Sequence, residues 1–193
     1  MTDESNEVVQ SKNTVGKDQV GRDKITTNNL NFGRSQSNIT AMQTLLSKFK
    51  EERKNNPQLD EFIEELDYYN KPLETDVIGL EQKLIDGNRE SFISYATRVK
   101  EVYHKKLYKF QFSEVAQRIN YHLLALVESY FTTYIYPRIC ESEDTNIINA
   151  LIIDTIINPL LDQLDENPLG FSATEINGML YFLTGNCHIK WAK

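Results

Sequence analysis

The chain opens with a tandem repeat whose five-residue period restricts the folds available to it. VGKDQ is followed directly by VGRDK in residues 15–24, and Ile25 begins a third, degenerate copy. An amphipathic helix needs apolar residues three and four apart, and a half-buried strand needs strict alternation, so this period fits neither. On a flat strand Val15 and Ile25 would point to one face and Val20 to the other. The backbone must therefore turn or bulge once per repeat to bring the three side chains together.

Glycine supplies such a turn, because a residue without a Cβ reaches positive φ at no steric cost. Gly16 and Gly21 occupy equivalent positions in the two copies, and Asp18 and Asp23 can accept hydrogen bonds within each turn. About twenty residues of bent β structure bury too little surface to be stable alone. We therefore predict an assembly arm that pairs with another subunit or with a second copy of itself. The residues assigned to this arm are Val15, Gly16, Asp18, Val20, Gly21, Arg22, Asp23 and Ile25.

The rest of the chain has the apolar spacing of helices. The first predicted helix buries a face made of Ile39, Met42, Leu46 and Phe49. We divide the chain into a disordered tip (1–12), a pentad-repeat β arm with a polar linker (13–36), and an all-α domain (37–193). The predicted fold class is therefore mainly α: a helical domain of six or seven helices with a short N-terminal β-repeat arm.

Two long helices are predicted in the second half of this domain. Ser113 is expected to cap a helix from about Glu114 to Tyr136 that stops before Pro137. The densest aliphatic run, residues 146–164, has many β-branched residues, but its length and spacing favour a buried helix. Pro159 is expected to kink this helix or to end its first part.

The last residues, NGMLYFLTGNCHIKWAK from Asn177, place Cys187 beside His188 and so invite a metal or nucleophile interpretation. Adjacent side chains point in different directions both on a strand and on a helix, which does not suit such a site. A zinc site needs further Cys or His ligands at a regular spacing. The remaining candidates, which form no recognised pattern, are Cys140, His104 and His122.

A structural interpretation accounts for the same stretch. The last helix begins at a capping box, Ser172-x-x-Glu175, and the tail after it is expected to dock through Ile189 and Trp191. Cys187 then serves as a small buried apolar residue. No P-loop, nucleophile elbow or paired-carboxylate arrangement stands out elsewhere. We therefore expect no catalytic, cofactor-binding or metal-binding residues, and a protein that is not an enzyme.

Charge and hydropathy limit the compartment and the partners. The net charge of −7 argues against the whole chain coating a nucleic acid. No apolar run approaches the roughly 18 residues that span a membrane, and the N-terminus lacks a signal-peptide pattern. Two cysteines make no disulfide framework, so we expect reduced thiols and a cytoplasmic location.

A basic segment, residues 98–118, stands out against this acidic background. Its charges recur at near-helical spacing, and its tyrosines can stack on bases, so it is a candidate nucleic-acid face. A solvated helix face, partly balanced by Glu101 and Glu114, explains the segment equally well, as does an acidic protein partner. The residues assigned to this face are Arg98, Lys105, Lys106 and Lys109.

The arm VGKDQVGRDKI, the helical body and the closing GMLYFLTGNCHIKW together resemble a known family. They are similar to the C-terminal associated domains of the ABC-three-component systems, prokaryotic defence systems that include the Lamassu (Ddm) type. Such systems combine an SMC- or Rad50-like ABC ATPase, a small middle subunit and an effector, often a nuclease. The resemblance covers the arm and the last helix well, and the middle of the chain only by its helical character.

This resemblance implies a subunit that holds an effector to the ATPase in a defence against phage or plasmid DNA, with indirect contact to DNA. In that family the domain often follows an effector domain in the same chain. Here only the tip MTDESNEVVQ precedes the repeat, so we expect a stand-alone accessory subunit or a fragment of a longer protein. The alternative is a nucleic-acid-binding helical module that uses the basic face of residues 98–118.

Overall fold

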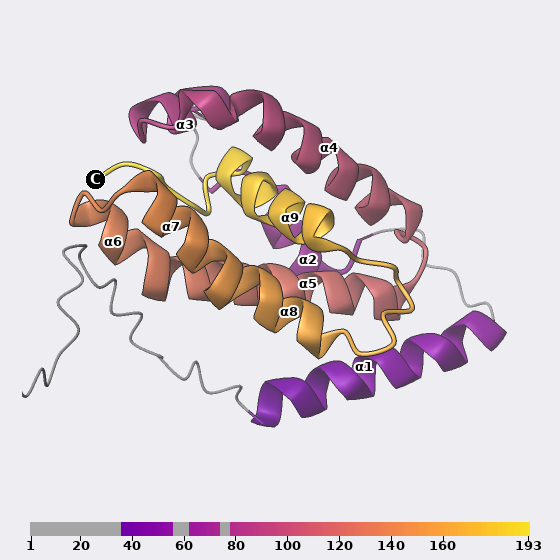
Figure 1. Cartoon of the computed structure of the whole chain (residues 1–193). Helices are drawn as coiled ribbons and strands as arrows, with labels where there is room; N and C mark the ends of the chain where they lie inside the picture. The colour runs from indigo at the N-terminus through magenta and orange to yellow at the C-terminus, as the bar shows by residue number, and fades with distance from the viewer. Residues whose placement is uncertain (1–35, 56–61, 74–77) are drawn as a thin grey trace, which may run out of the picture. The chain divides into compact units, whose positions relative to one another are not determined.

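The computed structural model describes residues 36–55, 62–73 and 78–193 (Figure 1). Within these ranges all regular structure is helical and forms seven continuous helices, which confirms the predicted mainly α fold. The predicted tip, the β arm and its linker up to residue 35 lie outside the described residues. The elements are α1 (Gln36–Asn55), α2 (Glu64–Asn70), α3 (Leu80–Asp86), the 3₁₀ turn η1 (Glu90–Phe92), α4 (Ile93–Lys109), α5 (Glu114–Tyr130), the π turn η2 (Phe131–Ile135), α6 (Tyr136–Cys140), α7 (Thr145–Ile152), the π turn η3 (Ile153–Ile157), α8 (Asn158–Gln163) and α9 (Ala173–Gly185).

The predicted end of the α5 helix before Pro137 is wrong, because the helix continues through the proline to Cys140. Proline lacks an N–H, and its ring collides with the carbonyl four residues back in a regular α-helix. The chain avoids this conflict by widening one turn. In η2 the N–H of Tyr136 donates to the carbonyl of Phe131, five residues back, and α6 then begins with the proline in its first turn, where no N–H is needed.

The same arrangement occurs at Pro159, where we predicted a kink or a break. The N–H of Asn158 donates to the carbonyl of Ile153 across the π turn η3, and the helix continues as α8. The aliphatic run is therefore one continuous helix with a local distortion directly before the proline, as the spacing of its buried residues requires.

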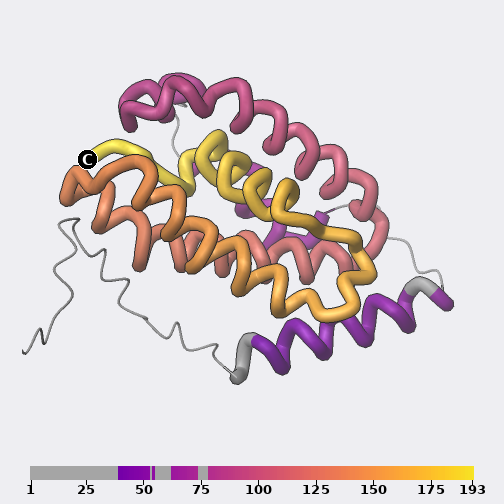
Figure 2. The backbone as a smooth tube through the Cα atoms, viewed as in Figure 1, coloured from indigo at the N-terminus to yellow at the C-terminus, as the bar shows by residue number. Residues whose placement is uncertain are grey.

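Helix α9 lies at the centre of the described domain, alongside α4 and next to the α7–η3–α8 helix (Figures 1 and 2). All its residues from Gly178 to Gly185 are buried, because helices cover it on several sides. A helix that is apolar around its whole circumference is stable only in such a position. None of the described helices has the length and hydropathy that crossing a membrane requires.

Two local capping predictions are confirmed, at the starts of α5 and α9. The Ser113 hydroxyl accepts a hydrogen bond from the Ala116 N–H at 3.1 Å. At the start of α9 the Ser172 N–H donates to a carboxylate oxygen of Glu175 at 2.8 Å, which completes the predicted capping box. The predicted apolar face of α1 is confirmed for Met42, Leu46 and Phe49, which are buried where α1 packs on α5, whereas Ile39 is only half-buried.

Candidate functional site

Buried hydrogen bonds join the segment that follows α9 to the rest of the domain. The Lys83 ammonium, from α3, donates to the carbonyl of Thr184 at 2.7 Å and to the Cys187 sulfur at 3.0 Å. The Trp191 indole N–H donates to the Thr184 hydroxyl at 3.0 Å. These bonds bind the end of α9 to α3 and fold the tail back over the last turn of α9.

Asn186 extends this anchoring to the end of α2 and the stretch after it. Its side-chain amide donates to the carbonyl of Tyr69 at 2.8 Å, and its own carbonyl accepts from the Leu73 N–H at 3.3 Å. The residue after it, Cys187, has a φ of 67°, in the left-handed region that side chains rarely adopt. The chain therefore reverses sharply here, so that the tail runs back toward α3.

The adjacent Cys187 and His188 are both buried and point to different neighbours, as the sequence analysis expects. The His188 ring packs against Tyr68 and Tyr69, and its Nδ1 lies 3.9 Å from a carboxylate oxygen of Glu128. Burial lowers the pKa of His188, and the Glu128 charge only partly offsets this effect. The described residues contain no group of three His, Cys, Asp or Glu side chains that could hold a metal ion.

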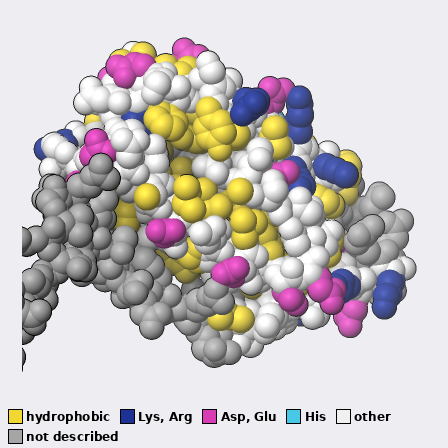
Figure 3. All heavy atoms as spheres, in the orientation of Figure 1, with side chains coloured by type: hydrophobic (Ala, Val, Ile, Leu, Met, Phe, Trp, Pro, Cys, Tyr) yellow, Lys and Arg dark blue, Asp and Glu magenta, His cyan; other side chains and the backbone are white. Residues whose placement is uncertain are grey.

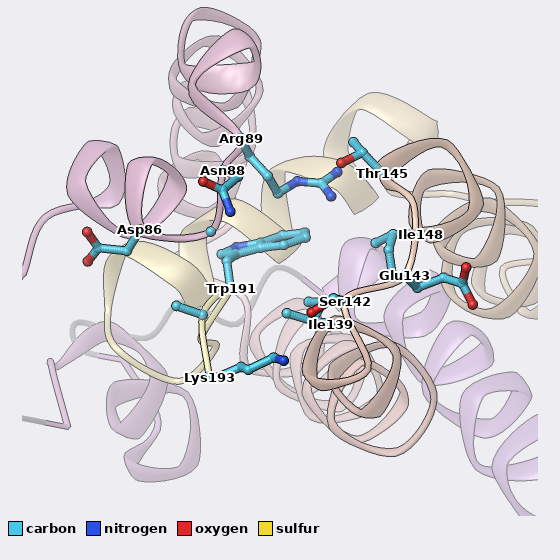
Figure 4. Close-up of a pocket in the computed structure, with 12 residues that line it drawn as sticks. Asp86, Asn88, Arg89, Ile139, Ser142, Glu143, Thr145, Ile148, Trp191 and Lys193 are labelled. Atoms are coloured by element: carbon cyan, nitrogen blue, oxygen red, sulfur yellow. The ribbon is translucent and has the colours of Figure 1, made fainter.

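The predicted docking of the tail is confirmed, because Ile189 and Trp191 are each only 1% exposed. Beside Trp191 lies a pocket of about 370 Å³ between the end of α3, the turn before α7 and the tail (Figure 4). Arg89 lines this pocket, with its guanidinium 4.5 Å from the centre of the Trp191 ring and 4.7 Å from that of Phe92. Arg89 is 4% exposed, and burial lowers its pKa.

Arg89 and Lys83, two cations that contact this tail, are not among the residues predicted from the sequence. Each lies in or beside the short helix α3, where charged residues alternate with apolar ones and nothing marks one charge as buried. Only the position of the tail, about a hundred residues later, covers them. No single-sequence signal therefore identifies them.

The structure divides the predicted basic face of α4. Arg98, Lys105 and Lys109 are exposed, and Lys105 pairs with Glu101 at 2.6 Å. Lys106 instead turns toward α9, where it forms an ion pair with Glu175 at 3.0 Å and also donates to the Gly170 carbonyl. On the face that Figure 3 shows, Lys and Arg side chains are interspersed with acidic and neutral ones and form no continuous patch.

We expect the two neighbouring lysines to differ sharply in their effect on stability. Lys106→Ala should lower the free energy of unfolding by about 2 kcal/mol, because it leaves the largely buried Glu175 carboxylate without its charged donor. Lys105→Ala is the matched control and should cost at most about 0.5 kcal/mol, since its ion pair is exposed to solvent. Urea denaturation of both variants measures the difference, and equal losses would contradict the assigned role of Lys106.

The eight residues of the predicted arm, from Val15 to Ile25, lie outside the described residues. The structure therefore neither brings them together nor separates them, and their role stays a prediction.

Comparison with known proteins addresses the rest of the chain. No curated protein and no solved structure matches it. A family described as C-terminal domain 9 of the ABC-three component (ABC-3C) systems matches residues 79–191, from the residue before α3 to Trp191. The match covers more than half of the chain and includes α4, the closing segment up to Trp191 and the Arg89 pocket except for Ala192 and Lys193. The chain therefore belongs to the family of C-terminal domain 9 of the ABC-three component systems.

Proposed function

We propose that this chain is a non-catalytic accessory subunit of an ABC-three-component defence complex. In this proposal it holds an effector, such as a nuclease, to an SMC- or Rad50-like ABC ATPase, as in systems of the Lamassu type. Family membership supports a role within a multi-component ABC system. The finer assignment to defence against phage or plasmid DNA rests on the sequence resemblance.

One observation supports the non-catalytic part of the proposal. Two residues of the closing motif with reactive or titratable side chains, Cys187 and His188, are engaged in packing. Cys187 accepts from Lys83, and His188 is enclosed by tyrosine rings and Glu128. Both are at most 9% exposed, and neither lines the pocket beside Trp191. Such contacts suit a rigid docking domain.

The alternative, a nucleic-acid module built on residues 98–118, receives less support. Its four predicted residues do not share one exposed face, because Lys106 is committed to Glu175 and Gly170. Lys105 is partly neutralised by Glu101. Sequence-independent binding to phosphates requires several unpaired cations along one surface.

The arm provides the direct test of assembly. The full chain is expected to co-purify with the ABC ATPase and the effector of the same complex. A chain lacking residues 1–35 should lose at least one of these two partners. Replacing the apolar residues Val15, Val20 and Ile25 together by serine should have the same effect, since the apolar side chains would supply the packing.

The matched control replaces Lys17 and Lys24 by alanine, two charged residues of the same repeats, and should leave assembly intact. Failure of the full chain to bind either partner would refute the proposed function. Retention of both partners after removal of residues 1–35 would assign assembly to the helical domain and exclude the arm.

A further inference from the structure

Arg89 is a buried cation that has no carboxylate partner among the described residues. Among the described residues, its guanidinium donates one hydrogen bond, from Nη2 to the side-chain oxygen of Asn149, and its buried Nε has none. No acidic side chain of the described residues forms an ion pair with it. Charged groups that are almost fully buried are normally paired, because removing a charge from water is costly.

The neighbours of Arg89 compensate this charge only in part. The faces of Trp191 and Phe92 attract the cation through their π electrons, and the neutral amide of Asn149 accepts one hydrogen bond. A carboxylate would bind a guanidinium more strongly, through two parallel charge-assisted hydrogen bonds. The site thus offers a favourable position for one negative charge.

The pocket that Arg89 lines is suited to supplying that charge from outside. Figure 4 shows the guanidinium pointing toward Thr145, while the carboxylates of Asp86 and Glu143 point away from the pocket. Asp86 accepts from Gln82 at 2.7 Å, and Glu143 accepts from the Asp144 N–H at 3.3 Å. Neither rim carboxylate therefore neutralises Arg89.

We propose that the Arg89 pocket binds the carboxylate side chain of an aspartate or glutamate from a partner polypeptide of the ABC-3C complex. A volume of about 370 Å³ accommodates a side chain of that size. Besides Arg89, the pocket is lined by two acidic residues, Asp86 and Glu143, and one basic residue, Lys193. This excess of negative charge, together with a net charge of −7, repels a multiply charged phosphate more than a single carboxylate. That the carboxylate belongs to a protein partner rests on the proposed function.

Trp191 makes the pocket directly measurable, because it is the only tryptophan of the chain and lies against Arg89. The probes are glutamate capped by N-acetyl and C-amide groups, glutamine capped in the same way, and inorganic phosphate, all at constant ionic strength. Capped glutamate should change the Trp191 fluorescence saturably and bind at least about tenfold more tightly than capped glutamine, since a charge-assisted bond is worth more than a neutral one. Equal binding of capped glutamate and capped glutamine, or tighter binding of phosphate than of capped glutamate, would overturn the assignment.

Asn149→Asp tests the site from within the chain. It places a carboxylate next to the Arg89 guanidinium, so it should raise the melting temperature and reduce the affinity for capped glutamate at least about tenfold. Asn158→Asp adds the same charge to an exposed position of the same continuous helix and should leave the affinity unchanged. An unchanged affinity in Asn149→Asp would show that the probe binds elsewhere and would overturn the proposal.

Co-purification of the full chain separates this inference from the proposed function. Asn149→Asp is expected to weaken capture of one partner, whereas Asn158→Asp is expected to retain it. Normal capture by Asn149→Asp would overturn the pocket's role in assembly and leave the proposed function standing. If capped glutamate binds the unmodified chain but that chain captures no partner, the carboxylate site stands and the proposed function is refuted.

Discussion

Trp191→Ala is expected to lower the free energy of unfolding by about 3–5 kcal/mol, the range typical of large aromatic residues truncated in a core. The indole is 1% exposed and stacks on Tyr181 with ring centres 6.1 Å apart. It also forms a T-shaped pair with the Phe131 ring and lies against the Arg89 guanidinium. The substitution removes all these contacts and leaves a cavity between α9, η2 and the end of α3.

Two further variants divide this loss into its parts. Trp191→Phe keeps a ring but removes the indole N–H that donates to Thr184, so it should cost less than the alanine variant. Ile153→Ala is the control for an exposed apolar residue and should change stability by no more than about 0.5 kcal/mol. Far-UV circular dichroism during urea denaturation measures all three. A loss below about 1 kcal/mol for Trp191→Ala would contradict an anchoring role for the tail.

The beginnings of helices were predictable because capping acts over three or four residues. Ser113 and the Ser172–Glu175 box satisfy backbone N–H groups of their own first turns, so no distant residue is needed to interpret them. The same locality holds for the buried face of α1, where the spacing of Met42, Leu46 and Phe49 alone defines one side of a helix.

The passage of two helices through proline was not predictable in this way. The rule that proline ends a helix assumes the hydrogen-bond register of a regular α-helix. At Pro137 that register changes, and the buried Phe131 and Ile135 of the π turn remain in the core as a result. Keeping these side chains buried offsets the cost of one wide turn, and that balance depends on tertiary packing.

The positions of the buried cations depend on tertiary packing as well. Lys105 and Lys106 are consecutive residues of α4, and only the docking of α9 distinguishes them. Glu175 of α9 pairs with Lys106, whereas Lys105 pairs with Glu101 of its own helix. Arg89 and Lys83 differ in the same way from the exposed charges around them. The sequence thus predicts which residues share a face, while the partner helix decides which charges are buried.

Gly178→Ala is expected to produce the second large loss, about 2–3 kcal/mol, because it overpacks the contact between α4 and α9. A Cβ at this position would lie 2.4 Å from the backbone carbonyl oxygen of Val99 and 2.5 Å from the Cβ of Tyr103. Neither atom can rotate away, so the two helices must separate. The gain of up to about 1 kcal/mol that alanine brings to a helix interior offsets only part of this cost.

Two other glycines provide matched controls for Gly178→Ala. At Gly79 an added Cβ would meet nothing within 4 Å, so alanine there should change stability by no more than about 0.5 kcal/mol. At Gly185 the nearest atom is the ammonium nitrogen of Lys100 at 2.5 Å, which is the end of a flexible side chain and can move. Gly185→Ala should therefore fall between the other two in urea denaturation. If Gly178→Ala were as stable as Gly79→Ala, the close approach of α4 and α9 would be wrong, and with it the central position of α9 on which the tail and the Arg89 pocket depend.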